Sequence, residues 1–208
     1  MATPDSSSTW IDLLRHGEPV GGRRYRGQTD DPLSDKGWQQ MRAAVDGYAG
    51  WNVIYSSPLR RCAEFAHELA DRLAIPLHLD ERLMEIGFGV WEGRTPDELR
   101  RDDPQILDRF WQDPVANRPD GAETLHAFHR RVAAAWNDIV AANPGRRILI
   151  VGHAGITRLV MTLVLDSPLD RLFRIQVGNA EITRIRIQSG LASSWPSLVF
   201  HGRASAIG

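Results

Sequence analysis

Two histidines in this sequence follow apolar runs and precede glycine-containing turns. His16 comes after the largely apolar residues 11–14 and is flanked by Arg15 and a glycine, and His153 comes after the apolar residues 148–151. Continuous apolar runs of this length are typical of buried strands in a parallel sheet. Because open α/β sheets bind ligands at the carboxyl ends of their strands, we expect both histidines at one sheet edge.

Nucleophilic and acid–base chemistry on an anion suits these residue types. A neutral imidazole is a nucleophile, and an Arg guanidinium binds phosphate oxygens through two parallel hydrogen bonds. A helix is expected to begin after His153, and its first amide groups would favour an anion at the same edge. Each motif taken alone also fits a polar surface turn, and that alternative stays open at this point.

Three further charged residues are candidates for this site. Arg60 and Arg61 lie at the start of the helix expected after Pro58, where the helix dipole does not stabilise a cation. A solvated helix face accounts for one of them. For the other, a role in a site and a second solvated arginine both stay open, because paired basic residues are common on surfaces. Glu85 lies in an apolar, glycine-rich segment at 83–93, where partial desolvation would favour the protonated carboxyl that a general acid needs. An exposed loop carboxylate is the alternative.

A metal site is not expected. His126 and His129 lie three residues apart in a helical pattern, whereas the two-histidine metal motif on a helix uses a spacing of four. With Arg130 and Arg131 beside it, His129 is interpreted as part of a solvated helix face. The chemistry is therefore expected to need no metal or other cofactor.

Apolar periodicity predicts the elements that must position these residues. Stripes at spacings of three and four indicate helices after Ser34, from Pro58 and over 125–140. Short apolar runs indicate strands at 11–14, 52–57, 76–79, 147–151, 182–187 and 198–200. Strands that alternate with helices predict an α/β fold with a mainly parallel central sheet and an antiparallel edge strand.

Length, charge and cysteine content limit the classes of protein that fit. A chain of 208 residues fits one domain, 1–208, and a net charge of -1 gives no overall attraction to nucleic acid or membranes. The single cysteine, Cys62, allows no intramolecular disulfide and suits a reducing compartment. Residues 1–8 are small and polar without the pattern of a signal peptide, and we expect them to be disordered. No apolar run is long enough to cross a bilayer, so a cytoplasmic protein is expected.

Four motifs together resemble one family. They stand in the order and approximate spacing of the histidine phosphatase superfamily, also called phosphoglycerate mutase-like. The motifs are Arg-His-Gly-Glu at 15–18, Ser-Pro-Leu-Arg-Arg at 57–61, Glu85 with Phe-Gly-Val-Trp-Glu-Gly at 88–93, and Gly-His-Ala-Gly at 152–155. Within the superfamily, Arg-Gly at 26–27, Asp-Asp-Pro-Leu at 30–33, Trp38 and Trp-Glu-Gly-Arg at 91–94 most resemble the bacterial α-ribazole phosphatases, which act in cobalamin assembly.

This resemblance implies a three-layer α/β/α sandwich and a role for each residue of the site. His16 would be the nucleophile that accepts the phosphoryl group, and Arg15 and Arg61 would bind that group. His153 would flank it, and Glu85 would give a proton to the leaving oxygen. Phosphoryl transfer needs such a nucleophile, positive groups around the phosphoryl oxygens and an acid, and the two arginines supply positive charge without a metal.

The loop after the first strand departs from the family pattern. Pro19 replaces the usual threonine, and the asparagine that often helps to bind phosphate is missing. Arg26 or backbone amides are the candidates that would complete the phosphate pocket, together with Gly27 and Ala154. Residues 94–146 are expected to form a substrate-covering insert followed by a long helix.

Several functions fit these motifs. An α-ribazole 5′-phosphate phosphatase is favoured because basic and aromatic side chains can stack on a flat base. The side chains expected to do so are Arg23, Arg24, Arg26, Phe110 and Trp111. Phe110 and Trp111 could equally be core residues, which is the commoner fate of Phe and Trp, and the enzyme could then be a broad-specificity phosphatase.

Two other functions stay open. A phosphoglycerate mutase is disfavoured because residues 95–119 lack that family's paired basic residues followed by a proline-rich stretch. A non-catalytic regulatory module is disfavoured because the five residues of the site are all present. The expected partner is a small-molecule phosphomonoester rather than nucleic acid or a membrane, and either a monomer or a homodimer fits.

Overall fold

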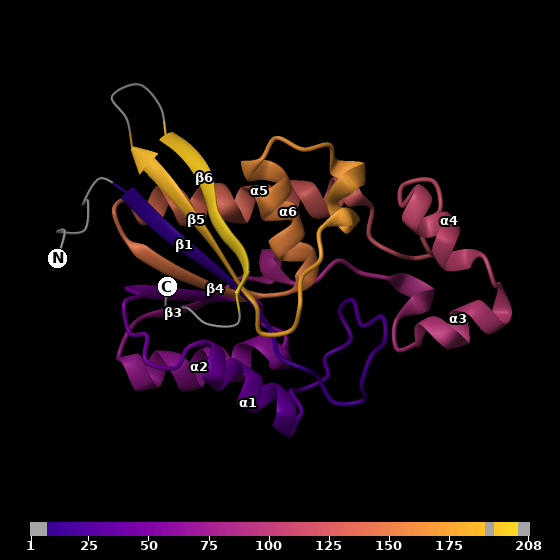
Figure 1. Cartoon of the computed structure of the whole chain (residues 1–208), viewed down its shortest axis with the longest axis horizontal. Helices are drawn as coiled ribbons and strands as arrows, with labels where there is room; N and C mark the ends of the chain where they lie inside the picture. The colour runs from indigo at the N-terminus through magenta and orange to yellow at the C-terminus, as the bar shows by residue number, and fades with distance from the viewer. Residues whose placement is uncertain (1–7, 190–193, 204–208) are drawn as a thin grey trace.

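A mixed β-sheet forms the centre of the fold. The computed structural model describes residues 8–189 and 194–203, and in this part of the chain six strands lie in the order β3-β2-β4-β1-β5-β6 (Figure 1). The strands are β1 (Ser8–Arg15), β2 (Val53–Ser56), β3 (Leu77–Leu79), β4 (Arg147–Gly152), β5 (Ile182–Ser189) and β6 (Ser194–Arg203). Strands β1 to β4 pair in parallel, and β5 pairs antiparallel with both β1 and β6. The predicted antiparallel edge is confirmed, and the strand that runs opposite to the others is β5.

Helices cover both faces of this sheet, which confirms the predicted three-layer sandwich. One face carries α1 (Asp35–Ala44) and α2 (Arg60–Leu73), and the other carries α5 (Leu125–Ala142) and α6 (Ala154–Val164) (Figure 1). Each pair of helices buries its apolar stripe in a separate hydrophobic cluster against the sheet. Because alternate strand residues point to opposite faces, Leu13 packs with the second pair and Leu14 with the first.

Helix starts follow capping chemistry. Ser34 caps α1, and its hydroxyl oxygen accepts a hydrogen bond from the amide of Gly37 at 3.0 Å. The amide of Arg60, at the start of α2, donates to the Asp30 carboxylate at 2.7 Å. The prediction that Pro58 lies in the first turn of this helix is wrong, because α2 begins at Arg60 and Pro58 lies before it. The helix after Ser34 is also shorter than predicted, because Tyr48 lies beyond its end and packs on Trp51 from a loop.

The span 94–146 falls into two parts in the structure. Helices α3 (Pro96–Asp102) and α4 (Ile106–Gln112) form a lobe beside the sandwich and have their own hydrophobic cluster, which includes Leu99 and Phe110 (Figure 1). Helix α5 instead belongs to the sandwich. Short 3-10 helices at Glu81–Leu83 and Gly89–Trp91 lead into the lobe, and a third at Leu169–Arg174 follows α6.

The first described residue corrects one expectation. Ser8 is part of β1, pairs with Gln188 and is buried, so the disorder expected for 1–8 is wrong at this residue, because the sheet extends to it. Residues 1–7 lie outside the described part of the chain.

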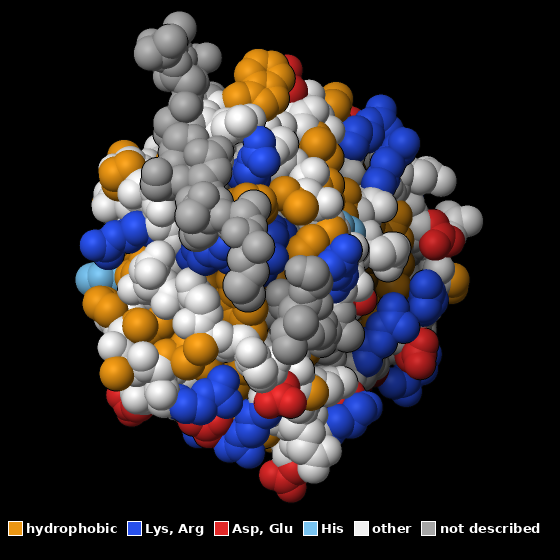
Figure 2. Space-filling view, turned by 60° about the vertical axis from the view of Figure 1, so that its left-hand side comes forward, with side chains coloured by type: hydrophobic (Ala, Val, Ile, Leu, Met, Phe, Trp, Pro, Cys, Tyr) orange, Lys and Arg blue, Asp and Glu red, His pale blue; other side chains and the backbone are white. Residues whose placement is uncertain are grey.

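On the face shown in Figure 2, basic and acidic side chains are interspersed, in keeping with the net charge of -1. No helix within the described residues is long and apolar enough to cross a membrane.

Candidate active site

Two parallel strands bring His16 and His153 together. Strands β1 and β4 are neighbours, with Arg15 in register with Gly152, so the residue that follows each strand lies at the same edge. The amide of His16 donates to the carbonyl oxygen of Gly152 at 2.9 Å. The two imidazole rings are 5.3 Å apart between centroids and lie edge to face. The juxtaposition expected from the strand ends is therefore present in the structure.

The hydrogen bond of His16 fixes which ring nitrogen is free. Its Nδ1 lies 2.7 Å from the carbonyl oxygen of Gly17, and because a carbonyl only accepts, Nδ1 must carry the proton. Nε2 then keeps its lone pair. Burial, followed by the positive charges of Arg15 and Arg61, holds the pKa of His16 well below its usual value of 6.5. His16 is thus a neutral, correctly protonated candidate nucleophile at neutral pH.

His153 is fully buried beneath the same edge. Its Nε2 lies 2.8 Å from the hydroxyl oxygen of Ser57, and burial together with Arg61 holds its pKa well below 6.5. The thiol of Cys62 packs beside the ring and lies 3.4 Å from the carbonyl oxygen of Gly152. Burial raises the pKa of this thiol to about 12, so Cys62 packs as an apolar residue and is not a second nucleophile.

Arg15 and Arg61 converge on this pair of histidines. Arg61 is 1% exposed and donates to the carbonyl oxygens of Thr29 at 2.7 Å and Gly27 at 2.8 Å. Arg15 donates to the carbonyl oxygen of Val177 at 2.6 Å, and burial lowers its pKa to about 10, which leaves it charged at neutral pH. In both side chains the buried Nε has no acceptor within the described protein. These N–H groups are ready donors for an oxyanion.

The two adjacent arginines of α2 differ in the burial of their side chains. Arg60 is exposed and forms an ion pair with Glu64 at 2.7 Å, one turn along the helix. Arg61 points into the site. The solvated face expected for one of them is therefore that of Arg60, and the alternative of a role in a site matches the burial of Arg61.

Glu85 reaches the start of α6. The amide of Gly155 donates to the two carboxylate oxygens of Glu85, at 3.1 and 3.2 Å. The amide of the next residue in the chain, Ile86, donates to Oε1 of Glu85 at 3.0 Å. A Cβ atom on residue 155 would stand 2.2 Å from Oε1, so the close approach requires glycine there. The half-buried carboxyl is therefore held in place by amide donors as well as by the apolar neighbours that the sequence indicates.

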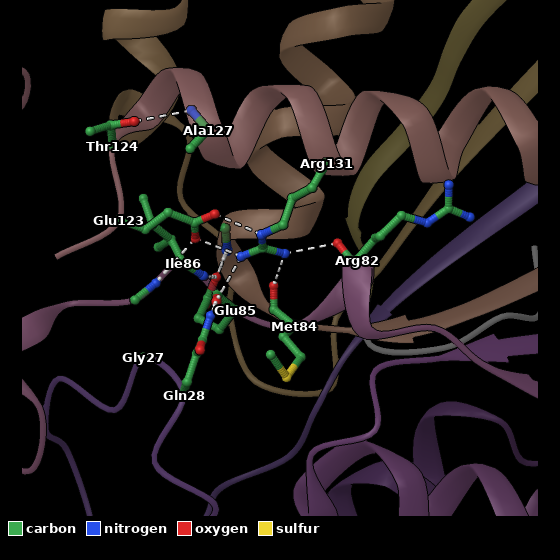
Figure 3. A network of polar contacts seen from close by, with 12 residues as sticks. Gly27, Gln28, Arg82, Met84, Glu85, Ile86, Glu123, Thr124, Ala127 and Arg131 are labelled. Atoms are coloured by element: carbon green, nitrogen blue, oxygen red, sulfur yellow. Dashed lines mark hydrogen bonds and ion pairs between the residues drawn. The ribbon is translucent and has the colours of Figure 1, made fainter.

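Arg131 holds the segment that carries Glu85 (Figure 3). Its guanidinium forms a two-point ion pair with Glu123, both distances being 2.7 Å. The same group donates to the carbonyl oxygens of Arg82 at 2.8 Å, Met84 at 2.7 Å and Glu85 at 3.0 Å. The interpretation of Arg131 as part of a solvated face is therefore wrong, because its side chain is only 20% exposed and its hydrogen-bond and ion-pair partners lie outside α5.

A cavity of about 300 Å³ opens at this edge. Among the expected site residues, it is lined by Arg15, His16, Arg26, Gly27, Arg61, Glu85 and Ala154. His153 lies beneath this surface. Aromatic side chains complete the wall, namely Tyr25, Phe88, Trp111 and Phe173. Phe110, expected as a wall residue, is buried in the cluster of the α3–α4 lobe, where it packs against Trp91.

Arg26 and Arg158 differ from what the sequence indicates. Arg26 lines the cavity, but it pairs with Asp31 at 3.0 Å and donates to two carbonyl oxygens of its own loop, so much of its guanidinium holds the loop together. Arg158 also lines the cavity, although it is not among the residues predicted from the sequence. The available signal was spacing, because a residue four after Ala154 lies on the same helix face.

Metal ligation is not built into this arrangement. Within the described residues, no group of three or more His, Cys, Asp or Glu side chains is placed to hold a metal ion. Positive charge at the site comes from arginine.

Comparison with known proteins places this geometry in a family. The model of the histidine phosphatase superfamily (branch 1) matches residues 11–194. The chain belongs to this superfamily. Among curated relatives, the bifunctional protein Rv2228c of Mycobacterium tuberculosis is 34% identical over 192 residues, which are 89% of this chain and 52% of that protein. The chain thus spans about half the length of such relatives. A probable phosphoglycerate mutase GpmB of Yersinia pestis is 29% identical, with 89% of each chain covered.

Solved structures of this superfamily have the same fold. YhfR of Bacillus stearothermophilus is 34% identical with a TM-score of 0.81, covering 92% of this chain and 95% of that one. The mycobacterial glucosyl-3-phosphoglycerate phosphatase Rv2419c is 26% identical, also with a TM-score of 0.81, covering 92% and 97%. The proteins that this chain resembles therefore include a phosphatase and a probable phosphoglycerate mutase.

Proposed function

We propose that this protein is a phosphomonoesterase that hydrolyses small phosphate esters through a phosphohistidine on His16. The observation that carries the proposal is the hydrogen bond from Nδ1 of His16 to the carbonyl of Gly17, which leaves Nε2 as the nucleophile. Arg15 and Arg61 supply the positive charge that the phosphoryl oxygens need, so the reaction does not depend on a metal.

In the first step Nε2 attacks phosphorus. The N–P bond forms, the P–O bond of the ester breaks, and its electron pair goes to the leaving oxygen. Glu85 gives that oxygen a proton. The amide of Gly155 holds the carboxyl of Glu85 at the cavity, where the leaving oxygen would lie. The proton stays on Nδ1, which keeps its hydrogen bond to the carbonyl oxygen of Gly17 while the ring becomes positively charged.

In the second step the same carboxylate acts as a base. Glu85 takes a proton from water, the water oxygen bonds to phosphorus, and the N–P electron pair returns to Nε2. Inorganic phosphate leaves, and both side chains regain their first protonation states. We assign His153 to the phosphoryl group as a flanking contact, because its ring lies edge to face with that of His16.

For the substrate, α-ribazole 5′-phosphate is the candidate that the sequence predicts. The aromatic wall of Tyr25, Trp111 and Phe173 supports it, because aromatic side chains stack on a flat base. Trp111 is 46% exposed and, with Pro96, is the part of the α3–α4 lobe that reaches the cavity. We propose that these two residues are the substrate-covering part of the span 94–146.

Phosphoglycerate mutase is the second candidate, favoured by the name of the Yersinia relative. The two are separated by assaying phosphate release and mutase turnover with α-ribazole 5′-phosphate, 3-phosphoglycerate and an aryl phosphate. We expect phosphate release to exceed phosphate transfer between substrates. Mutase turnover faster than hydrolysis would contradict the proposal, and no turnover of either kind would favour a non-catalytic module. A preference for α-ribazole 5′-phosphate below about tenfold in kcat/KM, roughly 1.4 kcal/mol, would reject that substrate.

A further inference from the structure

The cavity carries more positive charge than a phosphate ester needs. Its lining within the described residues holds six arginines and one carboxylate, that of Glu85. A phosphomonoester carries at most two negative charges, and Arg15 and Arg61 already match them. Arg26 has the carboxylate of Asp31 as its counterion. Glu85 is the one acidic side chain of this lining that is left for Arg23, Arg24 and Arg158, so the cavity keeps an excess of positive charge.

Arg158 differs from the two loop arginines because it is half-buried on a helix, whereas Arg23 and Arg24 are exposed. Its Nε donates to the carbonyl oxygen of Ile175 at 2.8 Å, and the guanidinium carbon lies 5.8 Å from the ring centre of Phe173. Within the described residues no carboxylate lies at ion-pair distance from it. Burial lowers the pKa of Arg158, and the charge of Glu85 opposes this shift. Arg158 and Arg15 line the same cavity, and the charge of Arg158 lowers the pKa of Arg15.

The partial burial of the Arg158 guanidinium without a carboxylate at ion-pair distance indicates that it binds a ligand. Buried charges in proteins are normally paired, because desolvation of an unpaired ion is unfavourable. The bond to Ile175 uses only Nε and fixes the side chain in place, which leaves the two terminal nitrogens as a planar fork for carboxylate or phosphate. The neighbouring aromatic ring limits access of water to one side of the group.

Helix geometry relates the position of Arg158 to that of Ala154 at the start of α6. Ala154 and Arg158 lie four residues apart on α6 and both line the cavity, so they differ in height by about 6 Å along the helix axis. Ala154 lies at the phosphate end, directly after His153. Both residues therefore face the cavity in which the phosphoryl group is expected to bind.

We infer that Arg158 binds a second acidic group of the substrate, a carboxylate or a further phosphate, while Arg15 and Arg61 hold the phosphoryl group that is transferred. This inference rests on the proposed phosphatase function and makes its substrate class more specific. The base of α-ribazole 5′-phosphate carries no negative charge, so the two modes of recognition are distinguishable: a preference for phosphorylated acids would assign selectivity to Arg158, and a preference for the ribazole ester would assign it to the aromatic wall.

Matched substrate pairs test this directly. O-phosphoserine and phosphoethanolamine differ only by a carboxylate, and 3-phosphoglycerate differs from glycerol 1-phosphate by a carboxylate in place of a hydroxymethyl group. We expect the wild-type protein to prefer the acidic member of at least one pair by tenfold or more in kcat/KM. Arg158→Gln should bring that ratio close to one, and Arg158→Lys should keep part of it. Arg171→Gln is the matched control, since Arg171 is an exposed arginine paired with Asp170 outside the cavity.

Each other result has a defined meaning. A wild-type ratio near one in both pairs, with clear hydrolysis, would overturn the inference and leave the phosphatase proposal intact. An equal fall for both members in Arg158→Gln would show that Arg158 only supports the cavity. A loss of the ratio in Arg23→Gln or Arg24→Gln instead of Arg158→Gln would assign the acidic group to the loop. No hydrolysis of any ester, and no phosphate trapped on His16, would reject the phosphatase function itself.

Discussion

The carboxylate of Glu85 occupies space that only a glycine at position 155 leaves open. Oε1 of Glu85 lies 2.2 Å from the point where a Cβ atom of residue 155 would stand, and both carboxylate oxygens accept from the Gly155 amide. Real Cβ atoms do not approach an oxygen this closely, so a side chain at 155 must displace the carboxyl group. Gly155 is therefore tied to the proton donor, although it has no side chain to react.

Gly155→Ala should lower activity and change stability little. Alanine is favoured over glycine by up to about 1 kcal/mol in a helix interior, but the added Cβ would also stand 3.2 Å from Cζ of the buried Phe128, and this tight contact opposes the gain. The displaced carboxyl should reduce kcat by about tenfold or more for esters with poor leaving groups. Gly152→Ala is the control, because its Cβ would make only ordinary contacts with Ile156. Steady-state kinetics and thermal unfolding check both parts, and full activity in Gly155→Ala would contradict the placement of Glu85.

Glu85→Gln keeps the shape of the side chain but cannot donate a proton. We expect hydrolysis of alkyl phosphates to slow by about a hundredfold or more, while an activated aryl phosphate, whose leaving group needs no proton, is largely spared. The measurement is kcat/KM over a series of leaving groups of different pKa. Uniform loss across the series would mean that Glu85 binds substrate or supports the fold instead.

Arg131 is expected to act through the position of Glu85. Arg131→Met removes the ion pair with Glu123 and the bonds to the carbonyls of residues 82, 84 and 85, so the segment should lose its fixed position. The rate should then become more dependent on leaving-group pKa, as it does in Glu85→Gln. Arg130→Met changes an exposed neighbour and should have no such effect. A loss of stability in Arg131→Met with an unchanged leaving-group dependence would assign it a purely structural role.

Stability should fall in mild acid because of the two buried histidines. Both His16 and His153 have folded-state pKa values well below the ordinary 6.5, so the unfolded chain takes up protons first as the pH drops. The stability that they provide as neutral groups is complete above 6.5 and is lost as the pH falls below it. Urea unfolding at pH 7.5 and pH 5.5 measures this loss, and it should be smaller in His16→Gln. An equal loss in both proteins would contradict the lowered pKa of His16.

The main part of the site follows from local sequence rules. His16 and His153 each end an apolar strand, and parallel neighbours must end at one edge, so their meeting can be predicted without a structure. The cap of α1 at Ser34 follows from the residue type at that position. Glu85 is placed by its apolar neighbours, but its amide donors depend on where α6 begins.

Long-range partners could not be predicted. Arg131 looks like part of a polar helix face because its partners are mainly backbone carbonyls almost fifty residues earlier, which leave no mark in the residue types. Phe110 and Trp111 are adjacent and similar, yet one fills the cluster of the lobe and the other reaches the cavity. Such choices depend on how α3 and α4 pack, which periodicity over seven-residue helices does not define.

Trapping of the phosphorylated protein tests the central claim most directly. The wild-type protein is mixed briefly with a labelled phosphate ester and quenched in alkali, in which phosphohistidine survives while acid releases it. We expect acid-labile phosphate on the wild-type protein and on His126→Ala, an exposed histidine distant from the cavity, and none on folded His16→Ala. Equal trapping on His16→Ala and the wild-type protein would contradict the assignment of His16 as the nucleophile.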